Sequence, residues 1–378
     1  MIEIRRRTPR AALIVLTLSI VSASGPDESG SLPSSMVAKI DASVAKVREA
    51  RKIPGLSVAI YDGRNLWSKG YGLADVENDI PATTKTVYRL ASVSKPITAV
   101  AAMKLVEAGK LDLDAPVQKY VPSFPEKQWP VTCRDLLSHL AGIRSYRGEE
   151  TQSTRHYLDR ISALEIFRDD PLLHEPGTKY LYSTYGFNLV GAAVAKASGK
   201  RFLEVLKSSI FEVAGMRTIR DDDPYAIIPV RARGYRLVGG RLQNSIPADI
   251  TNKVPGGGLC SDAPDVARFG AALIEGKILN PETMKRMWTP RKTKSGMPIG
   301  YALGWGIGRF RDEREVSHGG AQAKVSTVLY LRPDRKIVVV ILANLEGVPL
   351  MDLARELADA VQPNGIPSTS VEAKPLKR

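Results

Sequence analysis

The sequence predicts an α/β (α+β) protein with one antiparallel sheet, formed by strands from both ends of the chain and flanked by helices. Four segments of strand length indicate this, two early and two late in the chain: residues 56–61, 65–71, 325–331 and 336–343. Asp62-Gly63 and Pro333-Asp334 separate the members of each pair, as turn residues do in hairpins. Residues 116–270, where helical patches alternate with Pro and Gly, are expected to form a helical insert.

Amphipathic and buried helices should cover this sheet. Two segments have an apolar face at helical spacing, one near each end of the chain: Met36, Ile40, Val44 and Val47, then Leu350, Leu353, Leu357 and Val361. Residues 94–108 are apolar almost all round, which predicts a buried helix. Pro96 fits the first turn of that helix, where no N–H is needed. We expect residues 35–362 to form a single domain.

The first 25 residues are typical of a signal peptide. Arginines precede an apolar run at 11–21, and a small-x-small cleavage signal ends at Ala23. The run is shorter than the roughly 20 residues that span a membrane, although an uncleaved anchor is the alternative. We therefore expect an exported protein that is periplasmic or secreted after cleavage near Ala23. The sequence does not specify the export route. Residues 26–34 should be a flexible leader and 363–378 a disordered tail.

Charge and composition narrow the class of partner. The formal net charge is +14, which suits an anionic surface or a nucleic acid. Acidic residues are interspersed along the chain and no aromatic–basic patch occurs, which argues against nucleic acid. For an exported protein, an anionic cell envelope is the simpler partner. The four histidines lack metal-ligand spacing and no Walker phosphate loop occurs, so we expect no metal or organic cofactor.

The chain has two cysteines, Cys133 and Cys260, and both lie in apolar segments. We expect two buried free thiols, because free cysteine behaves as a small hydrophobe. A disulfide between them is the alternative in an oxidising compartment.

The candidate reactive group is a serine followed three residues later by a lysine, Ser92 and Lys95. On a helix, positions i and i+3 share a face, so the Lys95 amine can approach the Ser92 hydroxyl. A serine needs a base to take its proton, and burial lowers the pKa of a lysine enough for this role. The same spacing recurs at Ser43 and Lys46, on an amphipathic helix where a solvated surface pair is expected. Ser92 begins a buried helix, and this context favours it.

Six segments in order carry a resemblance to a known family: residues 89–95 (Arg-Leu-Ala-Ser-Val-Ser-Lys), 109–117 (Gly-Lys-Leu-Asp-Leu-Asp-Ala-Pro-Val), 136–144 (Leu-Leu-Ser-His-Leu-Ala-Gly-Ile-Arg), 176–184 (Pro-Gly-Thr-Lys-Tyr-Leu-Tyr-Ser-Thr), 256–259 (Gly-Gly-Gly-Leu) and 303–306 (Leu-Gly-Trp-Gly). The chain resembles the serine β-lactamase-related family of class C β-lactamases, D-Ala-D-Ala carboxypeptidases and esterases. The third and fourth segments are most similar to mitochondrial serine β-lactamase-like proteins. The resemblance covers residues 36–361 and implies a β-lactamase/transpeptidase-like fold.

The resemblance places the family's second motif, Tyr-x-Asn, on residues 182–184. Tyr182 beside Lys95 could shuttle protons as a general acid and base. The alternative is a buried tyrosine bonded to a carbonyl. Thr184 departs from the pattern, because a hydroxyl replaces the amide that asparagine offers to the substrate. This departure argues against β-lactams and peptidoglycan-stem amides and leaves the serine chemistry intact.

The third motif, Lys-Thr-Gly or His-x-Gly on a strand, fits His318 and Gly320. Lys294, Ser295 and Gly296 match the short pattern as well, but in a loop-like context. His318 could orient a substrate carboxylate or tune the second-motif tyrosine; the alternative is a simple polar strand residue.

The remaining expectations concern the oxyanion hole and the reaction. By resemblance, the backbone N–H groups of Ser92 and Ala321 would stabilise the oxyanion. His139 is expected to close a helix end. The predicted activity is acyl transfer through an acyl-enzyme, on a small-molecule or peptide substrate with an ester, amide or peptide bond. The alternatives are a D-Ala-D-Ala carboxypeptidase, a weak class C-like β-lactamase, and a non-catalytic binding or filament-forming protein.

Overall fold

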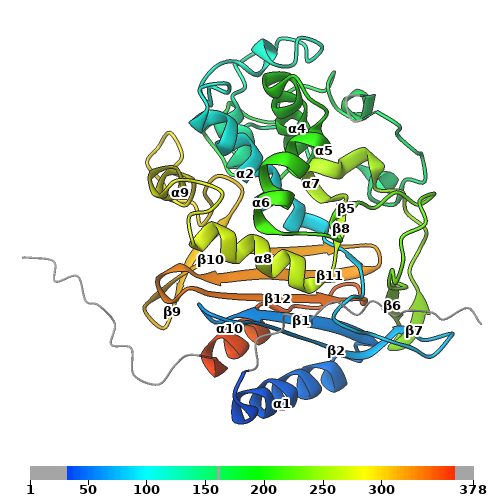
Figure 1. The fold of residues 1–378 in the computed structure, drawn as a ribbon. Coiled ribbons are helices and arrows are strands. Elements are labelled where there is room, and N and C mark those ends of the chain that lie inside the picture. The colour runs from blue at the N-terminus through cyan, green and yellow to red at the C-terminus, as the bar shows by residue number, and fades with distance from the viewer. Residues whose placement is uncertain (1–31, 160–161, 362–378) are drawn as a thin grey trace, which may run out of the picture.

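The computed structural model describes residues 32–159 and 162–361 of the chain. A seven-stranded antiparallel sheet separates a pair of helices on one face from a large helical half on the other (Figure 1). The predicted signal peptide, most of the predicted leader and the predicted tail lie outside the described residues.

The sheet joins the two ends of the chain. Its order is β3-β2-β1-β12-β11-β10-β9, so early and late strands meet where β1 pairs with β12. Every residue of β1 and β12 is buried, which explains their continuous apolar sequences. The strands are β1 (Gly55–Tyr61), β2 (Leu66–Asp75), β3 (Ile80–Pro81), β9 (Gly306–Phe310), β10 (Glu313–Gln322), β11 (Val325–Arg332) and β12 (Ile337–Ala343).

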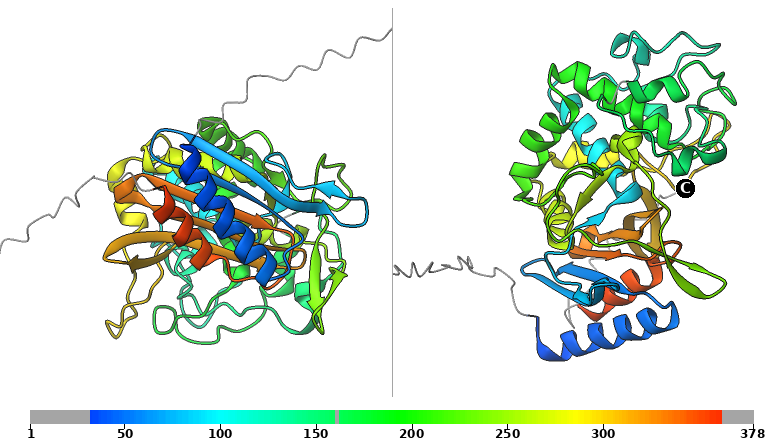
Figure 2. Two further views of the ribbon diagram at one scale, coloured as in Figure 1. Left: turned by 90° about the horizontal axis from the view of Figure 1, so that it is seen from below. Right: turned by 90° about the vertical axis from the view of Figure 1, so that its right-hand side faces the viewer.

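One face of the sheet is covered by α1 (Ser34–Ala50) and α10 (Met351–Ala360), which lie side by side (Figure 2). Ile40 and Val44 of α1 and Leu357 of α10 are fully buried in the core between these helices and the sheet. The apolar spacing of both segments thus predicted the helices and their inward faces. Burying each such side chain stabilises the fold by roughly 1.5–3 kcal/mol.

The other face carries the helical half. The buried helix predicted from residue 94 is α2 (Ser94–Glu107), and α8 (Ala263–Ile274) packs directly on β1 and β12. The other helices are α3 (Cys133–Leu137), α4 (Thr184–Ser198), α5 (Phe202–Leu206), α6 (Glu212–Ala214), α7 (Val254–Gly257) and α9 (Pro281–Met287). Short 3-10 or π turns are η1 (Ala91–Val93), η2 (Val117–Lys119), η3 (Gly148–Gln152), η4 (Ser162–Ile166), η5 (Lys207–Phe211), η6 (Thr251–Lys253) and η7 (Pro333–Arg335).

Further short strands, all but β4 within the insert, were not predicted from the sequence pattern. These are β4 (Tyr88–Arg89), β5 (Arg220–Asp221) and β8 (Leu259–Ser261) in one small sheet, and β6 (Tyr235–Val238) with β7 (Arg241–Asn244) in a hairpin. Strands of two to four residues are too short to show alternation. Cys133 and Cys260 are buried free thiols, as predicted. Among the described helices, none has the length and apolar character needed to cross a membrane.

Candidate active site

Ser92 lies in η1, the turn that leads from β4 directly into α2. Ala91 before it has φ +48°, a left-handed conformation that costs energy for a residue with a side chain. Its neighbours Ala91 and Val93 are buried, whereas Ser92 itself is partly exposed. The turn therefore presents the Ser92 hydroxyl to a cleft at the N-terminus of α2, where the helix dipole favours developing negative charge.

Lys95, one turn further along, has no solvent-exposed surface. Its Nζ lies 3.0 Å from Ser92 Oγ, 3.1 Å from Thr184 Oγ1 and 2.7 Å from the Gly256 carbonyl oxygen. Burial lowers the pKa of Lys95 well below 10.5, and the positive charge of Lys253 lowers it further. A neutral amine can donate to Thr184 and Gly256 and use its lone pair to accept the Ser92 hydroxyl proton.

The position of Gly256 explains how its carbonyl reaches a buried lysine. A Cβ on Gly256 would lie 2.6 Å from Thr184 Cγ2, so a side chain there would push α7 away from α4. The hydroxyl of Thr98 donates to the Pro255 carbonyl at 2.6 Å and ties α7 to α2 from the other side. Gly256 is thus required by close packing around the Lys95 amine, whereas a Cβ on Gly257 would meet no atom closer than 3.6 Å.

His139 fixes the position of Tyr182 through hydrogen bonds with the residues immediately before and after it. The Leu181 N–H donates to the His139 carbonyl at 2.8 Å, and the Ser183 N–H donates to His139 Nδ1 at 3.2 Å. The two rings also lie 4.2 Å apart between centroids. His139 has φ +59° just after α3, so it does end that helix, as predicted. Its second role as a support for Tyr182 depends on folding, and no spacing in the sequence indicates it.

Tyr182 completes a group of three around the hydroxyl of Ser92. Burial raises the pKa of Tyr182 above 10, while a hydrogen bond with Ser92 opposes this rise. Lys95 Nζ lies 4.8 Å from the centroid of the Tyr182 ring. A neutral phenol between the serine and the cleft is suited to donate a proton to a leaving group.

His318 lies on β10 and is buried. Its Nδ1 donates to the Gly319 carbonyl at 2.7 Å, and its Nε2 lies 2.8 Å from the Tyr301 hydroxyl. Burial, with a smaller contribution from the charge of Lys95, lowers the pKa of His318 to about 3, so the ring is neutral and Nε2 accepts from Tyr301. Both ring nitrogens are therefore engaged inside the protein, and the expectation that His318 could orient a substrate carboxylate does not fit these bonds. Its ring is 6.4 Å from that of Tyr182, which suits the tuning role.

The backbone of Ala321 faces the cleft because of the strand register. Arg311 and Asp312, both with positive φ, form the turn between β9 and β10. From this turn onward, the backbone N–H and C=O groups of the odd-numbered residues of β10 point toward β9, and those of the even-numbered residues point toward β11. Pairing with β9 stops at Ser317, so β9 leaves the backbone groups of Ala321 uncovered. Ala321 lines the same cleft as Ser92, and two backbone donors can meet one oxyanion there.

Gly320 permits this approach of β10 to η1. A Cβ on Gly320 would lie 2.2 Å from Thr327 Oγ1 and 2.7 Å from the Leu90 carbonyl oxygen. At Gly319, one residue earlier, a Cβ would meet no atom within 4 Å. Of these two adjacent glycines, only Gly320 is required by packing, because a side chain at Gly319 would meet no neighbouring atom.

The resulting cleft has a volume of about 220 Å³ and brings together Ser92, Tyr182, Thr184 and Ala321. Among the lining residues that were not predicted from the sequence are Tyr146, Arg236 and Lys253. Lys294, the alternative third-motif residue, is outside this cleft and pairs with Glu175 at 2.5 Å. The described residues contain no His, Cys, Asp or Glu cluster suited to a metal ion.

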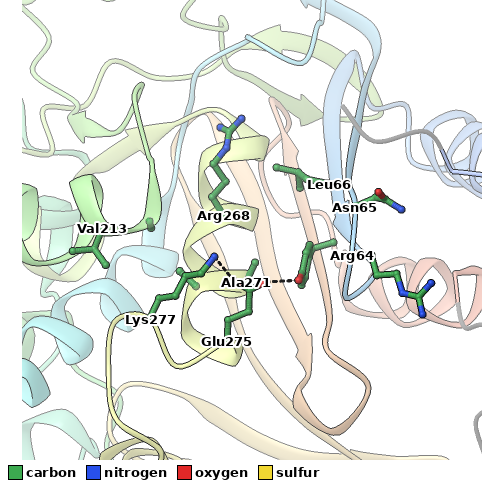
Figure 3. Close-up of a pocket in the computed structure, with 11 residues that line it drawn as sticks. Arg64, Asn65, Leu66, Val213, Arg268, Ala271, Glu275 and Lys277 are labelled. Carbon is green, nitrogen blue, oxygen red and sulfur yellow. Dashed lines mark hydrogen bonds and ion pairs between the residues drawn. The ribbon is translucent and has the colours of Figure 1, made fainter. Parts of the chain in front are cut away.

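A second groove lies beside α8, between the hairpin of β1 and β2 and helix α6 (Figure 3). Within it, Glu275 pairs with Lys277 at 2.6 Å and accepts a hydrogen bond from Tyr61, and Arg268 pairs with Asp265 at 2.7 Å. No residue proposed from the sequence for chemistry lines this groove.

A family model described as Beta-lactamase matches residues 40–362. The chain belongs to the β-lactamase family. It is 31% identical to the serine β-lactamase-like protein LACTB, mitochondrial, of Homo sapiens, with 83% of this chain and 77% of that protein covered. It is 26% identical to penicillin-binding protein 4* of Bacillus subtilis (strain 168), with 79% and 69% covered. The octameric penicillin-binding protein homologue from Pyrococcus abyssi has the same fold, with a TM-score of 0.75, 30% identity and coverage of 86% and 77%.

Membership of the β-lactamase family confirms two predictions from the sequence. The first is the family itself, a family of serine β-lactamase- and penicillin-binding-protein-like hydrolases. The second is the α/β fold of β-lactamase/transpeptidase type, with a helical insert between the early and the late strands.

Proposed function

We propose that the protein is a serine hydrolase that acts through an acyl-enzyme on Ser92. One observation carries the proposal: a fully buried lysine, whose pKa burial lowers, with its Nζ 3.0 Å from the Ser92 hydroxyl. A protonated lysine without an acidic partner at a buried position would destabilise the fold, so a structural role does not explain Lys95. Its position beside the Ser92 hydroxyl suits a general base.

Acylation begins when the Ser92 hydroxyl gives its proton to Lys95 Nζ and Oγ attacks the substrate carbonyl carbon. The carbonyl oxygen becomes an oxyanion, which accepts hydrogen bonds from the N–H groups of Ser92 and Ala321. Each such donor is worth about 3 kcal/mol of transition-state stabilisation. When the tetrahedral intermediate collapses, Tyr182 donates a proton to the leaving group and recovers one from Lys95.

Deacylation reverses these roles with water as the nucleophile. A water molecule attacks the acyl-enzyme carbonyl and loses a proton to the Lys95–Tyr182 pair. The ester bond to Ser92 breaks, and Ser92 Oγ takes the proton back. The acid is released and the starting protonation state returns.

The substrate class of this proposal is an ester, amide or peptide. Thr184 accepts a hydrogen bond from Lys95, so part of its polar capacity is used within the protein. A D-Ala-D-Ala carboxypeptidase or a weak β-lactamase is the second candidate, favoured by the resemblance to penicillin-binding protein 4*. The position of Thr184 in place of the asparagine favours esters and simple amides.

Intact-mass spectrometry after incubation with a fluorophosphonate, a series of 4-nitrophenyl esters and a penicillin tests the proposal. A single adduct on the Ser92 peptide is expected, and hydrolysis of at least one ester should depend on Ser92. A folded protein that forms no adduct with any of these reagents would favour the non-catalytic binding or filament-forming alternative.

We also propose export, on the basis of the arginines, the apolar run and the cleavage signal before Ala23. Expression of the full chain should yield a mature protein that begins close to residue 24, by N-terminal sequencing of the fraction outside the cytoplasm. Recovery of the uncleaved chain in the cytoplasm would contradict export.

A further inference from the structure

Lys253 is a second buried lysine in the wall of the active-site cleft. It ends η6, just before α7, and its side chain is 3% exposed. Its Nζ lies 4.8 Å from the centroid of the Tyr146 ring. Within residues 32–159 and 162–361, no acidic side chain or hydrogen-bond acceptor holds this amine.

The buried arginines among the described residues have acidic partners. Arg89 pairs with Asp222 at 2.6 Å, and Arg332 pairs with Asp359 at 2.6 Å. A buried charge without a partner is costly, so the presence of Lys253 beside the site, like that of Lys95, needs a reason. Burial lowers the pKa of Lys253 to about 8, and the charge of Arg89 contributes to this. The amine is therefore partly charged near neutral pH, and an anion beside it would stabilise the ammonium form.

The charges around Lys253 also favour an anion. Arg236 lines the same cleft, and its buried Nε has no hydrogen-bond partner among the described residues. Glu346 is the acidic residue in the lining, and it accepts a hydrogen bond from the Lys324 N–H at 3.0 Å. The cleft thus presents two cationic groups: the Lys253 amine, and the Arg236 guanidinium, whose Nη2 donates to Gln243 Oε1 at 3.5 Å while its Nε stays available.

We propose that Lys253, assisted by Arg236, binds a carboxylate on the acyl portion of the substrate. This rests on the proposed serine hydrolase activity and names its substrate class: acyl groups with a second, negatively charged carboxylate. The leaving group must meet its proton donor, Tyr182, which packs against His139. Lys253 lies instead over the Tyr146 ring, and we assign this part of the cleft to the group attached to Ser92.

The test compares two esters that differ in one charge, 4-nitrophenyl hydrogen glutarate and 4-nitrophenyl methyl glutarate. A substitution that alters the rate of the chemical step, for example by shifting the pKa of Lys95, affects both esters equally. Such an effect cancels in the ratio of their kcat/KM values. We expect the anionic ester to be preferred in the natural protein. In Lys253→Gln the ratio should fall by about 10- to 100-fold, the usual value of a charge-assisted hydrogen bond. Lys253→Arg should retain part of the preference.

Lys277→Gln is the matched control, because it removes the same charge from the groove of Figure 3, outside the active-site cleft. It should leave the ratio unchanged. A ratio near one in the natural protein, or equal losses in both lysine variants, would overturn the proposal and leave the hydrolase intact. Preference for a carboxylate on the phenol, measured with 4-carboxyphenyl acetate against phenyl acetate, would overturn the acyl-side assignment.

Binding gives a readout that does not need turnover. Monomethyl glutarate should bind to Ser92→Ala in calorimetry, and the additional change Lys253→Gln should weaken that binding by about tenfold or more. Binding that survives this change would contradict the role of Lys253. Binding that depends on Lys253, in a protein that no reagent acylates on Ser92, would refute the hydrolase and retain the anion site.

Discussion

Two regions of this molecule have the same serine–lysine spacing and opposite environments. On α1, Ser43 donates to Glu356 of α10 at 2.6 Å, and Lys46 is exposed on the outer surface. At the start of α2, Ser92 opens to a cleft and Lys95 is fully buried among neutral oxygens. The spacing is the same in both places, but only Lys95 is buried, and we propose that its burial makes it a base.

The difference has a simple physical cause. Water stabilises an exposed ammonium group, so a surface lysine stays charged and cannot accept a proton near neutral pH. Away from water, the charged form loses its hydration, and the neutral amine becomes the stable form. The two regions therefore supply matched controls for each other.

The largest loss of activity is expected when the proposed nucleophile, Ser92, is compared with Ser43. Ser92→Ala should lower kcat/KM for a 4-nitrophenyl ester by roughly 10⁴- to 10⁶-fold, because no other group forms the acyl-enzyme. Ser43→Ala should leave it unchanged. Peptide mapping of the fluorophosphonate adduct provides the direct check, and a label on Ser43 would show that the wrong serine was chosen.

The next largest loss of activity is expected when the proposed base, Lys95, is compared with Lys46. Lys95→Met should slow acylation by about 10²- to 10⁴-fold, the usual contribution of a general base, whereas Lys46→Met should have no effect. Thermal unfolding should show Lys95→Met to be as stable as the natural protein or more so, since a buried amine is replaced by an apolar chain. Loss of folding in Lys95→Met would instead indicate a structural lysine.

A third comparison uses the two glycines of β10. Gly320→Ala would force the strand away from Leu90 and displace the Ala321 N–H, so kcat/KM should fall by about 10²-fold, the value of one oxyanion donor. Gly319→Ala meets no atom and should retain most of the activity. Equal losses in both variants would place the oxyanion donor elsewhere.

The pH dependence of stability sharpens the contrast between buried and exposed lysines. The pKa of Lys95 is lower in the folded than in the unfolded protein, so unfolding takes up a proton between the lowered value and 10.5. Across that window stability should rise with pH, by up to about 1.4 kcal/mol per pH unit for this residue. Denaturant titrations at several pH values should show a shallower slope for Lys95→Met and an unchanged slope for Lys46→Met. Identical slopes would mean that Lys95 is protonated in the folded protein.

The smallest effect is expected at Thr184. Thr184→Asn restores the family's amide, and one added hydrogen bond to a substrate amide is worth about 0.5–1.5 kcal/mol. The ratio of kcat/KM for penicillin over a simple ester should therefore rise about two- to tenfold. If both activities fall and the ratio stays flat, Thr184 serves only to hold Lys95, and the preference for esters loses its support.

The sequence by itself was enough to predict the fold and the elements that carry the serine. Apolar spacing predicted α1, α2 and α10, and continuous apolar stretches predicted β1, β11 and β12, because burial imposes these patterns locally. The ordered segments from residue 89 onward indicated the family, which the match over residues 40–362 confirms. Ser92 and Lys95 were found in this way because their spacing and their apolar surroundings lie within one helix.

Only the tertiary structure decided what surrounds that pair. His139 supports Tyr182, Tyr301 engages His318, and Lys253 lies over the Tyr146 ring, and each of these three contacts joins separate parts of the chain. Their charge states depend on how much water reaches each group, and exclusion of water is a property of the packed molecule. A sequence pattern reports local periodicity, whereas the desolvation of a side chain is a sum over every neighbour that folding brings to it.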